Sequence, residues 1–350
     1  FCLGLKGPSM TLDTGDSSGL VAVRLASEAL SPFGASKTRG ATAFALAGGA
    51  RCLLSACQWP ELQAAGTLTQ AGRCLSFDAS AAGCVLGEGI VALVLRSHNT
   101  VGAALPSQES PELGALTGSS VNHSGHSATL GAPSGSAEQE VVRDALRAAH
   151  LTPQDIDAVE CHAQGSLLAD AVEVMSLGRC LRAEQSDQSL DLLAVRPNGG
   201  NSQHACGLLG LLRVLSSLSW GFLAPTLHLR ELSPLLGDLC DFPIDFITDH
   251  CDFRSSSSFV GVTARGFGTN VHAVVWGRLD ETKRPSPESR VSRHGKLLFW
   301  PGGGGDLLDA EQPELGYYIV GSWSSWSPEP MEEEEDGCFG FTVSLPQGTR

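Results

Sequence analysis

Residues 10–30 read MTLDTGDSSGLVAVRLASEAL, and this stretch indicates more than any other how the chain folds. A short apolar piece enters a tight turn of Gly, Asp and Ser at 14–19, and apolar residues three and four positions apart follow it. The pattern predicts a strand, a sharp turn and a helix. Such a turn presents a side chain at a helix N-terminus, where backbone N–H groups and the helix dipole favour negative charge. The turn is therefore the first candidate for a nucleophile.

Taken alone, the turn fits several kinds of site. Gly15 to Gly19 match the Gly-x-Ser-x-Gly elbow of α/β-hydrolases, in which Ser17 would be the nucleophile. Asp13 begins an Asp-Thr-Gly like that of aspartic proteases, but the second carboxylate motif that they need is absent. Gly15, Asp16 and Ser17 also resemble the Gly-Asp-Ser-Gly motif of trypsin-like proteases, but the Ala-Ala-His-Cys motif that supplies their catalytic His is absent. The Ser and Asp side chains could also do no more than cap the helix.

Composition narrows the function classes. The 350 residues carry 23 basic and 38 acidic side chains, a formal net charge of −15, which makes a poor binder of nucleic acid or anionic membranes. Hydrophobic residues make up 42%, enough for a sizeable core, and no apolar run is long enough to cross a bilayer. The eleven Cys include no Cys-x-x-Cys pair, so we expect no metal site. Their odd number fits a reducing, intracellular compartment, either cytoplasm or plastid.

Apolar strand-like and helix-like segments alternate along most of the chain. We expect helices at 138–150, 169–182 and 207–220, and strands at 42–54, 90–96, 115–121, 156–161, 190–195 and, as a pair, within 260–275. The first strand should be buried and broken at Gly48 and Gly49. This alternation predicts an α/β fold with a buried sheet.

The composition changes near residue 279. Residues 280–295 are rich in Pro and Ser and predict a linker between a domain at 1–279 and a partial β module at 296–350. The acidic run at 332–336 predicts a solvated loop.

Several segments, in the same order, resemble the ketosynthase (β-ketoacyl-acyl carrier protein synthase) domains of type I polyketide and fatty acid synthases. Each motif is weak alone, but their number and order make the resemblance specific over residues 1–277. The matching segments are GPSMTLDT at 7–14, ALAGG at 45–49, GRC at 72–74, FD at 77–78, GEG at 87–89, VN at 121–122, AP at 132–133, ECHAQGS at 160–166, PTLH at 225–228 and GFGTNVH at 266–272.

The resemblance implies a thiolase-like α/β/α/β/α sandwich with an incomplete first half, because only fifteen residues precede Asp16. It also implies decarboxylative Claisen condensation. A Cys on the elbow takes an acyl chain from an acyl carrier protein, two His assist the loss of CO2 from a malonyl extender, and backbone N–H groups form an oxyanion hole. No cofactor is implied beyond the carrier's phosphopantetheine. The implied partners are the acyl carrier protein, other synthase domains and a second copy in a homodimer.

Carried over residue by residue, the resemblance places altered residues at the catalytic positions. Asp16 stands at the nucleophilic Cys, His162 at the first His, Arg196 at the Lys and Asn201 at the second His. A carboxylate is a poor acyl acceptor, because a mixed anhydride is less stable than the thioester it replaces. An ionised Asp16 would also repel a malonyl carboxylate by about 1 kcal/mol. The sequence thus predicts a copy that is inactive or only decarboxylates, as loading-type relatives with Gln for Cys do.

Other positions leave alternatives open. His162 could be a loop His bonded to backbone groups, and Asn201 an ordinary polar loop residue. His204 is a candidate to replace the second His in space. Arg265 stands where the family has Phe, just before the substrate-binding turn. That turn, which lacks one Gly of the family motif, corresponds to Phe267, Gly268 and Thr269.

The tail resembles the first strands of starch-binding-type β-sandwich modules, in which Trp rings stack on sugars. Trp323 and Trp326 are the candidate glycan contacts, although both rings would serve equally in a core. The predicted function is thus a ketosynthase-family domain defective in condensation. A serine hydrolase using Ser17 is the alternative.

Overall fold

The chain divides into two units, Phe1–Arg284 and Pro285–Arg350, and the division falls inside the segment predicted as a linker. No helix in the described part of the chain is long and apolar enough to span a membrane. The computed structural model describes residues 7–31, 44–97, 112–127, 129, 131–183, 188–237, 242–282, 298–300, 303–305, 318–321, 324, 327–335 and 338–342.

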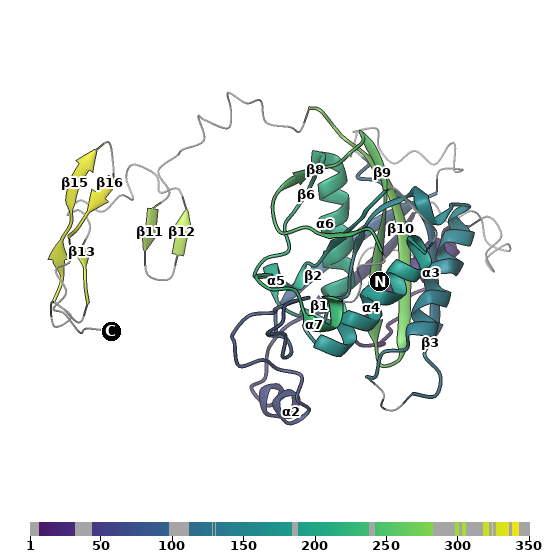
Figure 1. Cartoon of the computed structure of the whole chain (residues 1–350), viewed down its shortest axis with the longest axis horizontal. Helices are drawn as coiled ribbons and strands as arrows, with labels where there is room; N and C mark the ends of the chain where they lie inside the picture. The colour runs from purple at the N-terminus through teal and green to yellow at the C-terminus, as the bar shows by residue number, and fades with distance from the viewer. Residues whose placement is uncertain are drawn as a thin grey trace. The chain divides into compact units, whose positions relative to one another are not determined.

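A six-stranded mixed sheet forms the centre of the first unit, in the order β3-β10-β9-β4-β5-β7. Its strands β3, β9 and β10 are labelled in Figure 1. β3, β10 and β9 pair antiparallel, and β4, β5 and β7 continue from β9 in parallel. Parallel strands covered on both faces read as continuous apolar runs, which is why β5 is buried at every position. The bounds are β3 (Ala115–His123), β4 (Ile156–Glu160), β5 (Leu190–Leu193), β7 (Ile244–Phe246), β9 (Ser257–Gly266) and β10 (Thr269–Arg278).

Helices cover both faces of this sheet. α3 (Gly135–Ala149) and α4 (Leu167–Leu181) enclose one apolar core, and α1 (Ser18–Leu30) and α6 (Cys206–Trp220) enclose the other. Successive residues of a strand point to opposite faces. In β4, accordingly, Val159 belongs to the first core and Ala158 to the second.

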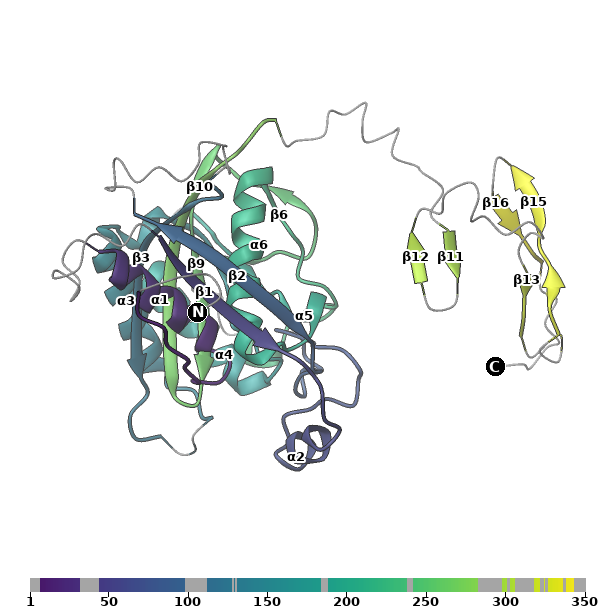
Figure 2. The same cartoon turned by 180° about the vertical axis from the view of Figure 1, so that it is seen from behind.

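A ribbon of two antiparallel strands, β1 (Phe44–Arg51) and β2 (Gly89–Arg96), forms a further layer over α1 and α6 (Figure 2). Ala47 and Val91 face inward and are buried, whereas Leu46, Ile90 and Val94 on the other face are exposed. The prediction of a buried strand broken at its two glycines was wrong, because pairing runs through both of them and one face is exposed. The alternating helix and sheet layers confirm the predicted α/β, thiolase-like architecture.

The other predicted strands and helices of this unit are confirmed to within three residues at each end. Short elements complete it. They are α2 (Gln58–Ala64), η1 (Pro153–Asp155), α5 (Arg196–Gly199), η2 (Gln203–Ala205), β6 (Phe222–Leu223), α7 (Pro234–Gly237) and β8 (Cys251–Asp252).

The second unit contains three two-stranded antiparallel pairs, and its described residues join them into no larger sheet. Most of the acidic run at 332–336, which was predicted as a loop, forms strand β15 instead. It pairs with β16, the segment that follows it. Trp323 and Trp326 lie outside the described residues. The pairs are β11 (Leu298–Trp300) with β12 (Gly303–Gly305), β13 (Tyr318–Ile319) with β14 (Glu329–Pro330), and β15 (Glu332–Glu335) with β16 (Cys338–Gly340).

The turn before α1 packs closely against the end of β9. A Cβ at Gly266 would lie 2.2 Å from the Thr14 carbonyl oxygen and 2.6 Å from the Asp16 nitrogen. Both contacts are to backbone, which cannot move aside as a flexible side chain can. Only glycine therefore allows the turn to approach the sheet this closely.

We expect Gly266→Ala to lower the free energy of unfolding of the first unit by about 3 kcal/mol, because the turn has to shift to admit the methyl group. Urea unfolding measures this change. Gly237→Ala is the matched control, since a Cβ there meets nothing within 4 Å. Equal stability of the two variants would contradict the close packing.

Candidate active site

The turn before α1 presents Asp16 at the start of a helix, as the sequence predicts. Gly15 adopts φ +66° and its N–H donates to Asp13 Oδ1 at 2.9 Å. No side chain caps the helix, so capping does not account for the polar turn. Residues 8–13 form no strand, and that part of the prediction was wrong.

Two predicted site residues bind Asp16 directly. Its Oδ2 accepts hydrogen bonds from Arg196 Nη2 at 2.6 Å and from Asn201 Nδ2 at 3.1 Å. The Arg196 side chain is completely buried, while 19% of the Asp16 side chain is exposed. Burial lowers the pKa of the Arg196 guanidinium, but the neighbouring Cys206 and Asp16 raise it by more than burial lowers it. The pKa of Arg196 therefore lies above its ordinary value. Asp16, which the sequence resemblance predicts at the nucleophile position, is thus one half of an ion pair.

His162 joins this cluster through the Arg196 guanidinium. Arg196 Nη2 lies 3.3 Å from His162 Nδ1 and 3.2 Å from Nε2. A donor in the ring plane cannot be this near both nitrogens without meeting the carbon between them, so the guanidinium lies over the ring face. His162 and Arg196 meet because they follow β4 and β5, adjacent parallel strands whose carboxyl ends share one edge.

The imidazole of His162 is neutral and we assign its proton to Nε2. Nδ1 accepts the backbone N–H of Arg265 at 3.2 Å, which leaves the proton on the other nitrogen. Burial, together with the cations of Arg196 and Arg265, holds the pKa of His162 well below its usual value. At neutral pH this side chain is a hydrogen-bond donor and not an imidazolium acid.

Two carboxylates on α4 fix the loop that carries His162. Glu173 accepts the backbone N–H of His162 at 2.7 Å through Oε1 and that of Ala163 at 2.9 Å through Oε2. Asp170 accepts the N–H groups of Gly165 and Phe77. The sequence analysis missed both carboxylates, although their place at the start of a helix that follows the His162 loop was a usable signal.

The remaining predicted residues lie around this cluster without bonding to Asp16. Phe267 has φ +47° and is 59% exposed, and its ring covers Gly15. Gly268 follows it in the turn and lies against the His123 ring, and Thr269 begins β10. Phe267 is therefore placed at the open side of the turn.

His204 does not take the place of the second His. Its Nε2 lies 3.1 Å from Asp13 Oδ1, whose side chain is 70% exposed. The serine hydrolase alternative finds no support either. Ser17 is fully buried, and its hydroxyl donates to the Thr14 carbonyl at 2.8 Å.

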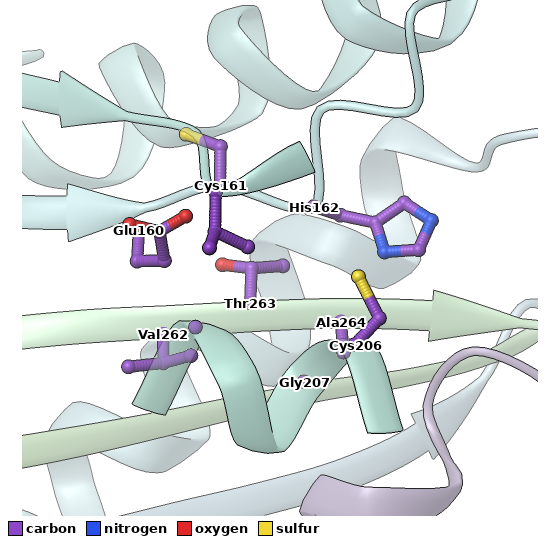
Figure 3. A pocket seen from close by; sticks show the side chains of 10 residues that line it. Glu160, Cys161, His162, Cys206, Gly207, Val262, Thr263 and Ala264 are labelled. Atoms are coloured by element: carbon purple, nitrogen blue, oxygen red, sulfur yellow. The ribbon is translucent and has the colours of Figure 1, made fainter. Parts of the chain in front are cut away.

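A cavity of about 10 Å³ lies beside His162, between β4, β9 and the start of α6 (Figure 3). It is large enough for about one water molecule. Glu160, which lines it, is buried with Oε1 unpartnered among the described residues, and its Oε2 pairs with Arg213 at 3.2 Å. Burial raises the pKa of the Glu160 carboxyl to about 7 and that of the Cys206 thiol to about 11. Cys206 is therefore protonated at neutral pH.

The described residues contain no group of three His, Cys, Asp or Glu placed to hold a metal ion. Eight described cysteines are free, and they are Cys52, Cys57, Cys74, Cys84, Cys161, Cys180, Cys206 and Cys251.

Comparison with known proteins identifies this arrangement. Residues 1–100 match the family model of the beta-ketoacyl synthase N-terminal domain, and residues 113–230 match that of the beta-ketoacyl synthase C-terminal domain. The chain belongs to the β-ketoacyl synthase family. It is 36% identical to erythronolide synthase EryA3 of Saccharopolyspora erythraea, over 98% of this chain and 10% of that protein. It is 34% identical to the spectinabilin polyketide synthase system protein NorA' of Streptomyces orinoci, over 89% of this chain and 8% of that protein.

Solved ketosynthase structures agree with this assignment. The oxazolomycin ketosynthase domain OzmH KS7 of Streptomyces albus matches with a TM-score of 0.70 and 28% identity, covering 77% of this chain and 46% of that one. The ketosynthase from module 6 of the bacillaene synthase of Bacillus subtilis matches with a TM-score of 0.71 and 29% identity, covering 79% and 48%. This β-ketoacyl synthase chain thus spans about a tenth of the curated relatives and about half of the solved chains.

The Asp16–Arg196 pair should respond unequally to loss of its two members. Asp16→Asn leaves a completely buried cation without a counter-ion, and we expect it to cost about 3 kcal/mol of unfolding free energy. Arg196→Met leaves the partly exposed Asp16 and should cost less. Urea unfolding of both variants and of the double variant gives the coupling energy. A coupling energy near zero would contradict a direct ion pair.

The buried carboxyls of Glu138 and Glu160 should each make the folded chain less stable as pH rises from about 4.5 to about 7, against the opposite contribution of the buried, neutral His162 and His272. Burial raises the pKa of both Glu138 and Glu160 to about 7 from 4.5, so at these two groups the folded chain binds more protons than the unfolded chain in that interval. Each group then removes about 3 kcal/mol of unfolding free energy by pH 8. Glu160→Gln should flatten the dependence measured by urea unfolding at pH 5 and pH 8. The exposed Glu61→Gln is the control, and equal slopes in the two variants would contradict the assignment.

Proposed function

We propose that this chain is a ketosynthase-family domain of a polyketide synthase. The domain binds carrier-bound acyl thioesters but forms no acyl-enzyme, and so it does not condense them. The observation that carries the proposal is the 2.6 Å contact of Asp16 Oδ2 with Arg196 Nη2 at the nucleophile position. Serine hydrolysis is not part of it.

Acylation of Asp16 is unfavourable for two reasons. The mixed anhydride would be less stable than the thioester that supplies the acyl group. Acylation would also remove the negative charge from Asp16 and leave Arg196 buried without a counter-ion, a cost of several kcal/mol. Arg196 Nε and Nη1 already have no hydrogen-bond partner among the described residues, and Asp16 is the carboxylate that pairs with this guanidinium.

The same geometry supports residual decarboxylation of a malonyl thioester. Arg196 neutralises Asp16, which offsets the repulsion of the malonyl carboxylate expected from the sequence. The neutral His162 retains an Nε2–H donor that would stabilise the enolate oxygen as CO2 leaves. A proton taken up at the α-carbon would then give the acetyl thioester.

Partners follow from the family. We include an acyl carrier protein, whose phosphopantetheine presents the substrate, and neighbouring synthase domains, since the curated relatives are polyketide synthases. Assembly as a homodimer and a reducing, intracellular location also belong to the proposal. Glycan binding by Trp323 and Trp326 stays a prediction, because both lie outside the described residues.

Transfer of a radiolabelled acyl chain from an acyl carrier protein tests the proposal. The unaltered chain of 350 residues should carry no label after denaturing electrophoresis. Asp16→Cys combined with Arg196→Lys should become labelled, because a thiol replaces the paired carboxylate and forms a thioester. Cys84→Ala added to that variant is the control and should keep the label. Labelling of the unaltered chain that Asp16→Ala abolishes would overturn the proposal.

A further inference from the structure

Arg265 carries a second buried charge pair beside the same site. Its Nη1 lies 2.7 Å from Glu138 Oε1, and its Nη2 lies 3.8 Å from Glu173 Oε2 and 3.5 Å from the Ala169 carbonyl oxygen. The exposed fractions are 9% for Arg265, 3% for Glu138 and 1% for Glu173. The family resemblance predicts Phe at position 265, where this chain has a cation. The groups that contact Arg265 therefore indicate its role in this chain.

Glu173 connects Arg265 to the His162 loop. Each of its two oxygens accepts one backbone N–H, from His162 and from Ala163. A protonated carboxyl would turn one of these acceptors into a donor and lose a bond, so the arrangement requires an ionised Glu173. A carboxylate this deeply buried needs a nearby cation. Arg265 is the cation paired with Glu173 in the described part of the chain.

The loop depends on these two bonds because its backbone is strained. Ala163 has φ +40°, in the left-handed region that side-chain-bearing residues seldom adopt. The Glu173 bonds to the N–H groups of Ala163 and its neighbour hold the loop in that conformation. The backbone N–H of Arg265 then meets His162 Nδ1, so one residue acts on His162 by two routes.

Glu138 anchors the guanidinium from the opposite side. Its Oε1 binds Arg265, and its Oε2 has no partner among the described residues. Burial raises the pKa of the Glu138 carboxyl to about 7 despite the neighbouring cation. Glu138 can therefore lose its charge near neutral pH, whereas Glu173 lies 3.8 Å from Arg265 Nη2 as a second carboxylate for the same guanidinium.

We propose that Arg265 is a positioning residue for His162, acting through the carboxylate of Glu173 and through its own backbone N–H. The inference rests on the proposed function only in taking His162 as the donor at the site. The charged groups around the His162 ring and backbone are Arg196, Arg265 and Glu173.

Nuclear magnetic resonance of the full chain labelled with ¹⁵N-histidine tests this proposal without substrate. His162→Gln assigns the ring signals. In the unaltered chain His162 should stay neutral, protonated at Nε2, from pH 5.5 to 8. Arg265→Met should shift the His162 ring signals and speed amide exchange at His162 and Ala163 about tenfold relative to the rest of the sheet. Arg265→Lys, which keeps the cation, should restore much of the original behaviour.

Two further variants separate positioning from stability. Glu138→Gln should change stability and leave the His162 signals in place, because Arg265 still pairs with Glu173. Glu173→Gln should weaken the bonds to the His162 loop with Arg265 intact. If Arg265→Met does not fold, this variant tests whether Glu173 positions His162. Unchanged His162 signals in the folded Arg265→Met variant, or in Glu173→Gln, would overturn the inference. These spectra do not depend on acyl transfer, so this result and the labelling experiment can fail separately.

Discussion

A cation buried as completely as Arg196 must be paired, and the site is built around that requirement. Its guanidinium lies over the face of His162 and donates to Asp16, so the residue at the nucleophile position is its counter-ion. Loss of Asp16 would be costly, because it would leave this buried cation facing no anion. The family resemblance has Lys, also a cation, at position 196, so the replacement of Cys by Asp16 is what adds the counter-ion.

His162 lies between two cations and takes its properties from them. Arg196 lies over its ring and Arg265 binds its Nδ1 through the backbone, and both oppose protonation. An imidazole beside these two cations stays neutral, but its N–H can donate a hydrogen bond to a developing negative charge. The proposed function rests on this neutral donor and on the pairing of the Asp16 carboxylate with Arg196. This combination supports enolate stabilisation more readily than acyl transfer.

Motif order was enough to predict that Asp16, His162, Arg196 and Asn201 converge, because each follows a recognisable strand or turn. The pairing of Arg265 with Glu138 could not be predicted, since 127 residues separate them and neither lies in a local pattern that signals the other. The exposed face of β1 and β2 was missed for a different reason. Small and apolar residues alternate on both faces there, so the sequence does not distinguish an inner from an outer side. The acidic run in the tail pairs as a strand because the following segment supplies the partner.

Other thiols near the site show why position alone does not make a nucleophile. Cys206 begins the 15-residue helix α6 and lies close to Arg196, two features that normally favour a thiolate. Burial outweighs both and raises the pKa of that thiol to about 11. Cys84 is 3% exposed, and burial likewise raises the pKa of its thiol. The Asn201 Nδ2 donor 3.6 Å from the sulfur lowers that pKa, but by less. Asp16 is partly open to solvent but already paired with a cation, whereas the two thiols are buried. A reactive anion needs both access and an unoccupied charge, and no single described residue of this site combines them.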